Sequence, residues 1–341
     1  MIGIRVDNNS TIGMGHLFRC LSIANALVNA GEQLCFFCSS DSNTDFIIKS
    51  GYDCKVVFRS KYNDWCVEDE IACLKDNNIS VLVVDSYYID KDIIFELHEH
   101  FKILYIDDFI NKDFDVDVIV NYNIEVTDID YDNIAFQNRL VYTGISFFPL
   151  RENLKHDSLR RLLPDVKNVL ITSGATDPCH CIDSILTELN VGYFTNIQFN
   201  VILGVFFDEE YIKLLQDKYE NNVVFLNWTN DMKSIYDYTD MMIAPGATMV
   251  YEALSSGVPC LTYEFVDNQH AECIILNKLG VSPFIGNYSD GVFNYFDNRI
   301  KVLFEEEIKY ENRLKRFNIF SKMFDGMGTQ RISEIIINLK Q

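Results

Sequence analysis

Length, composition and charge limit what kind of protein this chain can be. Its 341 residues exceed one ordinary domain and suit two domains of about 150–170 residues each. With 48% hydrophobic residues, including 25 Phe and 18 Tyr, each half can build a sizeable core. Acidic residues outnumber basic ones by 50 to 29, which gives a formal net charge of −21. Because such a surface repels polyanions, we expect no nucleic-acid partner and no membrane partner.

The ten cysteines are scattered and form no disulfide framework in the sequence. Several of them, such as Cys35 and Cys260, lie in apolar runs, where buried thiols are common. No apolar run reaches the roughly 18 residues that a membrane span needs, and no signal-peptide pattern follows Met1. We therefore expect a reduced, cytoplasmic protein.

The N-terminal stretch is typical of a strand, a glycine turn and a helix. The apolar run Ile2–Val6 ends at Asp7, and Gly13 and Gly15 follow a short polar loop. Apolar residues then recur at steps of four, three and four on one helix face: Leu17, Leu21, Ala24 and Val28. Glycines let a backbone approach a ligand closely, and a helix N-terminus attracts anions. Within this stretch, His16 is the side chain suited to acid–base chemistry near pH 7.

The rest of the first half alternates apolar runs with helix-length segments such as Asp64–Asn77 and Lys91–His100. The apolar runs are Leu34–Cys38, Cys54–Phe58, Val81–Asp85, Ile103–Ile106 and Val118–Val120. Continuous apolar strands separated by helices predict a parallel sheet covered on both faces. Ligands of such sheets bind at the carboxyl ends of the strands, which is where Asp7, Asp85 and the pair Asp107-Asp108 lie.

A first domain is expected to span residues 1–155. Val141–Gly144 is typical of its last strand, and it leads through Pro149 and Leu150 to Arg151. The charged stretch Glu152–Asp165 is the best candidate for a linker, because it is polar and ends in a Leu-Pro-Asp turn.

The second half, residues 165–341, starts the alternation afresh. Its predicted strands are Asn168–Thr172, Phe199–Leu203, Val223–Leu226, Met241–Ala244 and Pro259–Tyr263. Each half thus opens with a strand, a glycine loop and a helix, which predicts two doubly wound α/β domains that face each other across a cleft. Met323–Leu339 is expected to form a final helix that could pack back on the N-terminal domain.

The motif Gly13-x-Gly15-His16 does not identify a function by itself. The dinucleotide-binding fingerprint needs a third glycine at the position of Phe18, so NAD binding is disfavoured. His16 could be a general base, or it could only help to cap the helix, and the spacing favours neither hypothesis.

A second motif, from Ala244 to Pro259, combines a glycine turn with a short helix. The amides around Gly246 and the helix N-terminus can hold a diphosphate. Glu252, about one turn into the helix, can accept hydrogen bonds from both hydroxyls of a ribose. The alternative is an ordinary strand-to-helix turn with a glutamate on the surface.

Three further groups are open to more than one interpretation. Asp267-Asn268-Gln269 either caps a helix or presents Asn268 and Gln269 to a sugar or phosphate. Cys179-His180-Cys181 has metal-ligand residue types but lacks a partner cluster at a suitable spacing. Asp115-Val116-Asp117 is more typical of a solvated turn than of a cation site. We therefore expect no metal site.

Taken in order, these stretches resemble the UDP-2,4-diacetamido-2,4,6-trideoxy-β-L-altropyranose hydrolases of pseudaminic acid biosynthesis. The N-terminal signature Ile12–His16 with Arg19 and Cys20 carries the resemblance. The later stretches that fit are Asp85–Tyr87, Ile106–Asp108, Asn121–Asn123, Gly144–Arg151, Gly174–Pro178, Gly246–Glu252 and Asn268-Gln269. Gly246–Pro259 is also similar to the UDP-binding loop of the bacterial lipid II N-acetylglucosaminyltransferase. Both families have the GT-B fold, with two Rossmann-like domains.

The resemblance implies a hydrolase that needs neither metal nor cofactor and releases UDP from a UDP-activated amino sugar. Water would attack the anomeric carbon with inversion. His16 matches the family's catalytic histidine, and Tyr87 matches a tyrosine near the sugar. Substrate contacts would come from Asp7, Gly13, Gly15, Arg19, Arg151, Gly174, Thr176, Asp177, Gly246, Ala247, Thr248, Glu252, Asn268 and Gln269.

The chain departs from the family pattern at two glycine loops. Ser173-Gly174-Ala175 and Pro245–Thr248 each contain one glycine fewer than usual. Phe148 and Pro149 also differ from the family's residues before the arginine, so the exact sugar stays open.

The chemistry of the residues fits this reaction. A diphosphate is a good leaving group, so the step mainly needs a base for the water, and an imidazole with a pKa of about 6.5 is suitable. Asp7, at the end of the preceding strand, could orient the imidazole of His16. One alternative is a GT-B glycosyltransferase with a UDP-amino sugar donor, in which His16 deprotonates an acceptor hydroxyl. Another is a nucleotide-sugar binding protein without turnover.

Overall fold

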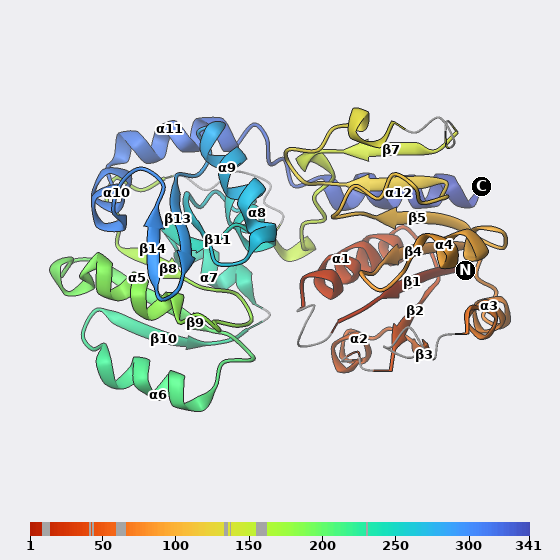
Figure 1. The fold of residues 1–341 in the computed structure, drawn as a ribbon, viewed down its shortest axis with the longest axis horizontal. Coiled ribbons are helices and arrows are strands. Elements are labelled where there is room, and N and C mark those ends of the chain that lie inside the picture. Colours follow the sequence, from red (N-terminus) through yellow and green to blue (C-terminus); the bar gives the residue numbers. More distant parts are fainter. Residues whose placement is uncertain are drawn as a thin grey trace. The chain divides into compact units, whose positions relative to one another are not determined.

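The apolar runs of the sequence form the strands of two sheets, one in each of two units of the computed structural model (Figure 1). The first unit contains residues 1–152 and 326–341, and the second contains residues 153–325. The structure describes residues 1–8, 14–40, 42, 44–58, 66–132, 136, 138–154, 162–229 and 231–341. Half of the expected linker stretch, residues 155–161, therefore lies outside the described residues.

The first unit is built on a parallel sheet whose described strands run in the order β3-β2-β1-β4-β5-β6-β7. They are β1 (Ile2–Val6), β2 (Leu34–Ser39), β3 (Cys54–Phe58), β4 (Val81–Asp85), β5 (Lys102–Ile106), β6 (Val118–Asn121) and β7 (Leu140–Thr143). Every residue of β1 and of β4 is buried, as expected for central strands that are covered on both faces. The prediction of a parallel sheet is confirmed.

Helices cover both faces of this sheet. They are α1 (Gly15–Asn29), α2 (Asp45–Lys49), α3 (Val67–Asp76), α4 (Lys91–His98) and α12 (Gly328–Lys340), with 3₁₀ turns η2 (Asp128–Tyr131), η4 (Ile145–Phe147) and η5 (Glu152–Leu154). The chain crosses from β1 to β3 in one direction and from β3 to β5 in the other. Right-handed crossovers therefore place α1 and α2 on one face and α3 and α4 on the opposite face. The last helix, α12, packs against α1 and contacts β4 and β5, so it belongs to the first unit.

The buried face of α1 is wider than the sequence pattern predicts. Leu17, Leu21 and Ala24 are buried as expected, but Val28 is 46% exposed and Leu27 is fully buried in the last turn. The reason is that α1 packs against both its sheet and α12, so side chains on two neighbouring faces of the helix are covered.

The second unit repeats the topology of the first, with the order β10-β9-β8-β11-β12-β13-β14. Its strands are β8 (Asn168–Ile171), β9 (Gln198–Leu203), β10 (Val223–Asn227), β11 (Met241–Pro245), β12 (Cys260–Glu264), β13 (Phe284–Ser289) and β14 (Val292–Tyr295). Its helices are α5 (Cys181–Leu189), α6 (Glu209–Lys218), α7 (Met232–Tyr238), α8 (Thr248–Ser255), α9 (His270–Lys278), α10 (Ile300–Glu307) and α11 (Tyr310–Phe320), with 3₁₀ turns η6 (Val191–Tyr193) and η7 (Asp267–Gln269).

The hairpin of β13 and β14 is the part of this sheet that the sequence analysis does not predict. These two strands are antiparallel, whereas the other neighbouring strands of the sheet are parallel. Asp290 and Gly291 connect them with φ values of 52° and 81°. An Asp-Gly pair with two positive φ values is the signature of a type I′ hairpin turn, so the sequence does contain the signal.

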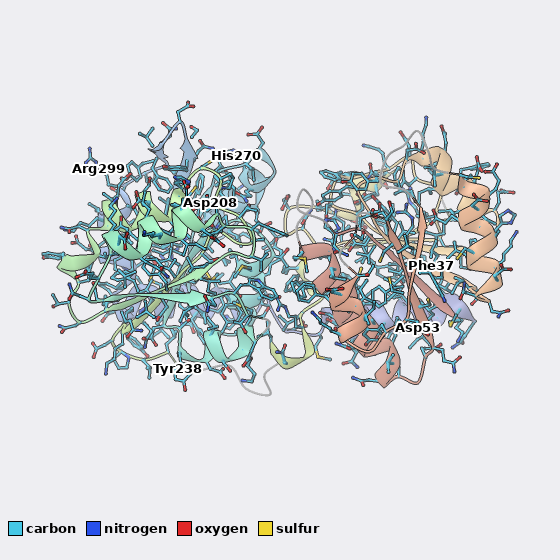
Figure 2. The ribbon with its side chains drawn as sticks, turned by 90° about the horizontal axis from the view of Figure 1, so that it is seen from below. Phe37, Asp53, Asp208, Tyr238, His270 and Arg299 are labelled. Carbon is cyan, nitrogen blue, oxygen red and sulfur yellow. The ribbon has the colours of Figure 1, made fainter. Side chains whose placement is uncertain are left out.

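Each unit has its own apolar core (Figure 2). In the first unit, Phe37 is fully buried with residues of α3, α4 and the sheet, whereas Asp53 lies at the surface. In the second unit, Phe199 and Phe304 pack together inside, whereas Tyr238 is 75% exposed. Among the described residues, no helix is long and apolar enough to cross a membrane.

Candidate active site

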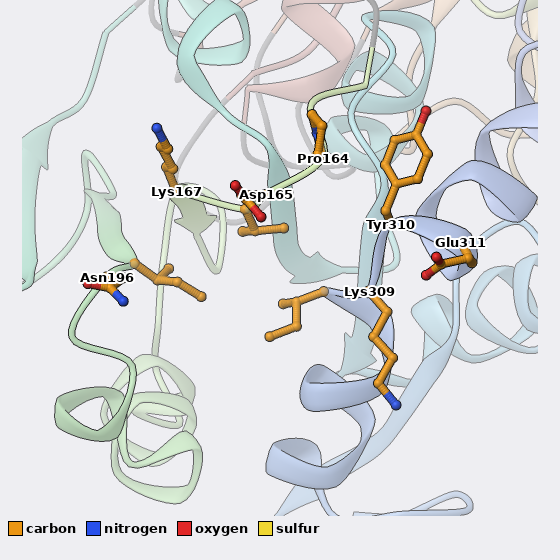
Figure 3. Close-up of a pocket in the computed structure, with 10 residues that line it drawn as sticks. Pro164, Asp165, Lys167, Asn196, Lys309, Tyr310 and Glu311 are labelled. Atoms are coloured by element: carbon orange, nitrogen blue, oxygen red, sulfur yellow. The ribbon is translucent and has the colours of Figure 1, made fainter.

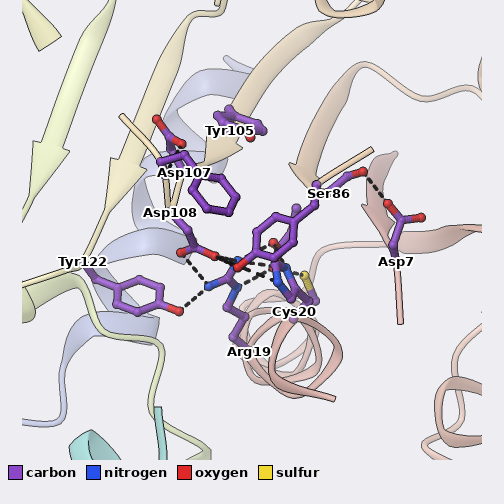
Figure 4. A network of polar contacts seen from close by, with 12 residues as sticks. Asp7, Arg19, Cys20, Ser86, Tyr105, Asp107, Asp108 and Tyr122 are labelled. Carbon is purple, nitrogen blue, oxygen red and sulfur yellow. Dashed lines mark hydrogen bonds and ion pairs between the residues drawn. The ribbon is translucent and has the colours of Figure 1, made fainter. Parts of the chain in front are cut away.

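The carboxyl ends of neighbouring strands in the first unit gather a set of polar side chains (Figure 4). Asp7 follows β1, Asp85 ends β4, Asp107 and Asp108 follow β5, and Tyr122 follows β6. The strand order reverses between β1 and β4, which is the place where open α/β sheets bind ligands. Asp7, Asp85 and Asp107 are each at most 1% exposed, so these carboxylates need partners inside the protein.

His16, the second residue of α1, is directed to one of these carboxylates. Its Nδ1 lies 2.5 Å from Oδ1 of Asp85, and the side chain is 6% exposed. An ionised carboxylate can only accept a hydrogen bond, so Nδ1 of the imidazole must carry the proton and donate. In a neutral imidazole, Nε2 then keeps its lone pair. Within the described part of the chain no side chain caps α1, whose N-cap residue is Met14. The geometry therefore favours the general-base hypothesis for His16 over the capping hypothesis.

Arg19 joins two of the carboxylates. Its Nε and Nη2 donate to Asp85 over 2.6 and 2.5 Å, and its Nη1 and Nη2 donate to Asp108 over 3.0 and 2.9 Å. Nη1 also donates to the hydroxyl of Tyr122. All five N–H groups of Arg19 thus have acceptors within the first unit, which leaves none for the substrate contact that the resemblance implies. Arg19 instead holds Asp85 and Asp108 in place.

Tyr87 lies against the imidazole and is held by the second carboxylate. The rings of His16 and Tyr87 meet edge to face with centroids 4.3 Å apart, and the Tyr87 hydroxyl donates to Oδ2 of Asp108 over 2.8 Å. The same Oδ2 lies 3.9 Å from Nε2 of His16, too far for a hydrogen bond. Nε2 therefore has no hydrogen-bond partner among the described residues, while Tyr87 is 37% exposed beside it.

Charges in this network set two protonation states. Burial by itself would raise the pKa of Asp85, but the positive charge of Arg19 and the contact with His16 hold it well below its usual range. Burial and the charge of Asp108 raise the pKa of Tyr87 far above its ordinary value. Asp85 is therefore a permanent acceptor for the imidazole, and Tyr87 keeps its proton and acts as a donor.

The hypothesis that Asp7 orients the imidazole is wrong, because Asp85 makes that contact. Asp7 accepts a hydrogen bond from the hydroxyl of Ser86 with Oδ2. Its Oδ1 is buried and has no hydrogen-bond partner among the described residues. A buried acceptor without a donor is destabilising, which makes Asp7 a candidate to receive an N–H or O–H group of a ligand.

The other substrate contacts expected in the first unit are Gly13, Gly15 and Arg151. Gly13 lies outside the described residues. Gly15 is exposed and begins α1. The guanidinium carbon of Arg151 lies 4.5 Å from the centre of the Phe18 ring, so Arg151 stacks on the first turns of α1.

In the second unit, the loop after β8 requires a glycine. Gly174 has a φ of 90°, a backbone conformation that favours glycine, and its N–H donates to Oγ1 of Thr172 over 3.0 Å. A Cβ at Gly204, after β9, would lie 2.4 Å from the carbonyl oxygen of Ala175, so these two loops touch through their backbones. Thr176 is half-buried in the same loop.

Asp177 ends this loop and stabilises the start of α5. Its two carboxylate oxygens accept from the N–H groups of Cys181 and Ile182 over 2.8 and 3.0 Å. Oδ2 also accepts from the hydroxyl of Tyr211 over 2.8 Å. These bonds give Asp177 a structural role that the sequence analysis does not predict.

The loop after β11 leads into α8. A Cβ at Gly246 would lie 2.4 Å from Sγ of Cys273, so the close packing requires glycine. Ala247 is the N-cap residue and Thr248 begins the helix, and no side chain of a described residue caps it. The N–H of Val250 donates to the carbonyl oxygen of Ala247 over 2.8 Å, so the N–H groups of Thr248 and Met249 are left for another acceptor, such as a phosphate oxygen.

Glu252 lies inside the second unit rather than on its surface. It is 3% exposed, and the hydroxyl of Tyr236 donates to its Oε2 over 3.4 Å.

Oε1 of Gln269 accepts from the N–H of Phe265 over 3.1 Å and so holds the turn before α9. The side chain of Asn268 lies outside the described residues.

A cavity of about 750 Å³ in the second unit is a poor candidate for the active site (Figure 3). Pro164 and Lys167 line it on one side, and Lys309 and Tyr310 on the other. Pro164 and Lys167 precede β8, so the cavity lies at the amino end of that strand, whereas the glycine loops follow the carboxyl ends. Among the described residues, no group of three or more His, Cys, Asp or Glu could hold a metal ion.

The network around His16, which we call the His16 network, consists of Arg19, Asp85, Tyr87, Asp108 and Tyr122. Asp85, Asp108 and Tyr122 are not among the site residues predicted from the sequence. The signal for the two aspartates is present, because both lie where predicted strands end. What the sequence does not contain is the partner of each, since Asp85 is 69 residues from His16 and Asp108 is 89 residues from Arg19.

Comparisons with known proteins come from sequence relatives and solved structures. No family model matches the chain. The uncharacterized protein MJ1062 of Methanocaldococcus jannaschii is 28% identical over 271 residues, which are 76% of this chain and 54% of that protein. The chain thus spans about half the length of that relative. The spore coat polysaccharide biosynthesis protein SpsG of Bacillus subtilis is 21% identical over 355 residues, with 99% of this chain and 98% of that protein covered.

Solved structures match both units together. MurG of Acinetobacter baumannii has a TM-score of 0.65 at 13% identity and covers 99% of each chain. UGT89C1 of Arabidopsis thaliana, solved with UDP-L-rhamnose, has a TM-score of 0.69 at 10% identity and covers 100% of this chain and 99% of its own. The chain has the GT-B glycosyltransferase fold. UGT2 of Phytolacca americana, solved with UDP-2fluoro-glucose and pterostilbene, adds a GT-B match with a TM-score of 0.67 at 13% identity over the whole of both chains.

Proposed function

We propose that this GT-B protein is a hydrolase that releases UDP from a UDP-activated 2,4-diacetamido-trideoxy-hexose. The product would enter the biosynthesis of a nonulosonic acid of the pseudaminic type or of another surface polysaccharide. Two comparisons support the proposal. The relative SpsG is named for polysaccharide biosynthesis, and solved structures with this fold contain UDP-sugars.

The second unit would hold the nucleotide. The uncapped N-terminus of α8 and the tight turn at Gly246 suit a diphosphate, because N–H groups and the helix dipole attract negative charge without a lysine or arginine. Glu252, an ionisable acceptor buried in that helix, would accept the ribose hydroxyls. Such neutral donors matter in a chain whose net charge of −21 repels phosphates.

The contact between His16 and Asp85 is the observation that carries the proposed reaction. Nε2 of His16 takes a proton from water, and the water oxygen forms a bond to the anomeric carbon. The bond from that carbon to the diphosphate oxygen breaks, and its electron pair leaves with UDP, so the configuration inverts. Asp85 accepts from Nδ1–H throughout and stabilises the imidazolium that forms.

Replacement of His16 tests the proposal. His16→Asn and His16→Phe should lower kcat for UDP release by at least about 100-fold, because the step loses its base. UDP binding, measured by calorimetry, should stay within about twofold, because the proposed nucleotide loops belong to the second unit. Near-normal turnover with intact substrate affinity would show that His16 is not the base.

A glycosyltransferase is the second candidate function, because the solved structures that the chain matches include glycosyltransferases. His16 would then deprotonate an acceptor hydroxyl in place of water. Incubation with the UDP-sugar alone separates the two reactions. Rapid UDP release without an acceptor supports the hydrolase, and release only after an acceptor is added supports the transferase. Tight UDP binding without turnover under either condition would favour a binding protein.

A further inference from the structure

Phe109 is an exposed residue whose ring contacts Tyr87 of the His16 network. Phe109 is 57% exposed, and its ring lies 4.7 Å from that of Tyr87, which in turn lies 4.3 Å from the imidazole of His16. Single exposed apolar side chains are common, but the ring contact with Tyr87 places Phe109 beside the proposed base. The mechanism above does not use Phe109.

The carboxylate of Asp107 holds the loop that contains Phe109. Oδ1 of Asp107 accepts from the N–H of Phe109 over 2.9 Å and from Nδ2 of Asn111 over 2.8 Å. Oδ2 accepts from the N–H of Asn111 over 2.5 Å and from the hydroxyl of Tyr131 over 2.8 Å. Asp107 is 1% exposed, so the oxygens that accept these four bonds are buried, and the bond from Tyr131 is buried as a whole. The backbone of the loop is therefore held in place at Phe109.

The residue after Phe109 has a strained backbone. Ile110 has a φ of 59°, which is unfavourable for a β-branched residue. Such strain persists only where the surroundings over-determine it, and it is concentrated at functional sites. Here the bonds of Asp107 and the bond from the N–H of Lys112 to the carbonyl oxygen of Ile110, 2.9 Å long, supply that constraint. The chain thus keeps an unfavourable conformation in the loop that holds an apolar ring in solvent.

We propose that Phe109 is a specificity-determining residue whose ring binds an apolar part of the sugar. The inference rests on the proposed function, in which His16 acts at the anomeric carbon of a UDP-sugar. A sugar that has lost hydroxyl groups and carries methyl and acetamido substituents presents C–H groups to such a ring. An aromatic face of this kind adds contact area without taking up hydrogen-bonding groups. Phe109 would then favour deoxy amino sugars and contribute nothing to binding of the UDP part.

Phe109→Ala, measured with a UDP-2,4-diacetamido-2,4,6-trideoxy-hexose and with UDP alone, tests this. We expect KM to rise about tenfold, kcat to stay within about twofold, and the dissociation constant of UDP to stay unchanged, because the ring contacts only the sugar. Phe95→Ala is the matched control, since Phe95 is 52% exposed on α4 of the same unit and should change none of the three.

Two results would overturn the assignment. A fall in kcat at constant KM would mean that Phe109 acts by positioning Tyr87 and His16, and unchanged constants would mean that the ring touches no ligand. Absence of turnover by the wild-type protein would refute the proposed function instead. In that case the dissociation constants of the UDP-sugar and of UDP, compared between Phe109→Ala and wild type, still decide whether the ring contacts the sugar.

Discussion

Replacement of Asp85 by asparagine is the sharpest perturbation of the His16 network. The two side chains have the same shape, so the change removes a charge and one acceptor without opening a cavity. Asp85 is fully buried and receives hydrogen bonds from Nε and Nη2 of Arg19 and from Nδ1 of His16. Asparagine has one accepting oxygen, so its amide nitrogen must face either Nε of Arg19 or both Nη2 of Arg19 and Nδ1 of His16, which share Oδ1 of Asp85.

Both orientations of the amide are unfavourable, but they differ in kind. If the nitrogen faces His16, it donates to Nδ1, moves the imidazole proton to Nε2 and removes the base. If it faces Nε of Arg19, N–H groups oppose each other beside a buried guanidinium. Charge-assisted hydrogen bonds contribute about 1.5–3 kcal/mol each, so the loss should destabilise the fold by about 3 kcal/mol. The wrong tautomer should lower kcat by about 10³–10⁴-fold.

Asp117→Asn is the matched control for this experiment. Asp117 also accepts from a histidine in the first unit, with 3.1 Å to Nε2 of His98, and from Lys102 over 2.9 Å. It precedes β6, so it lies at the amino end of the sheet, away from the carboxyl ends that carry His16 and Asp85. The control should lose stability but keep kcat within about threefold, because no base is affected.

The assay measures UDP release at saturating UDP-sugar, with the free energy of unfolding from chemical denaturation followed by circular dichroism. A kcat for Asp85→Asn within tenfold of wild type would refute the argument that Asp85 sets the tautomer of the base. An equal loss of kcat in Asp117→Asn would show that lower stability, and not the tautomer, is responsible.

Two further predictions concern the nucleotide loop and pH. Gly246→Ala should weaken UDP binding about tenfold by calorimetry, because overpacking of this kind costs about 1–3 kcal/mol, whereas Gly192→Ala, where a Cβ meets nothing within 4 Å, should bind UDP normally. Equal affinities would remove Gly246 from the site. The hydrogen bond to Asp117, and the charge of that carboxylate, raise the pKa of His98. His98 therefore contributes fully to stability below its unfolded pKa of about 6.5, and the contribution is lost as pH rises through the raised value. His98→Gln should remove this fall in the free energy of unfolding as pH rises from about 6.5 through the raised pKa, and identical pH profiles of the variant and wild type would contradict the pairing.

The sequence predicts the fold well because the strands of both sheets are short, continuous and apolar. Each central strand is covered on both faces, so hydrophobicity alone marks it, as in Val81–Asp85. The prediction is weaker where tertiary packing overrides local pattern. Val28 has the correct helical spacing yet is exposed, because the position of α12 decides which faces of α1 are buried.

The site is predicted only in part, for a physical reason. Residues that act through the local backbone can be found from spacing, and His16 at the start of a helix and the turn at Gly246 are of this kind. Partners that meet across strands cannot, because nothing local pairs His16 with Asp85 rather than with Asp7. The adjacent strands β1 and β4 bring Asp7 and Asp85 to the same edge of the sheet, so topology alone leaves both as possible partners. Only the three-dimensional structure shows that Asp85 is the partner of His16.

The two histidine–aspartate contacts of the first unit show why residue type alone does not identify a base. Nδ1 of His98 lies 3.3 Å from Asp115 and its Nε2 lies 3.1 Å from Asp117, so both ring nitrogens face carboxylates, which favours the protonated ring. His16 makes one such contact through Nδ1, and its Nε2 lies 3.9 Å from Oδ2 of Asp108. The free lone pair on Nε2 of His16 is what distinguishes the His16–Asp85 contact from the contacts of His98. Arg19 maintains it, because it holds Asp108 with two hydrogen bonds and so keeps the second carboxylate from closing on the imidazole.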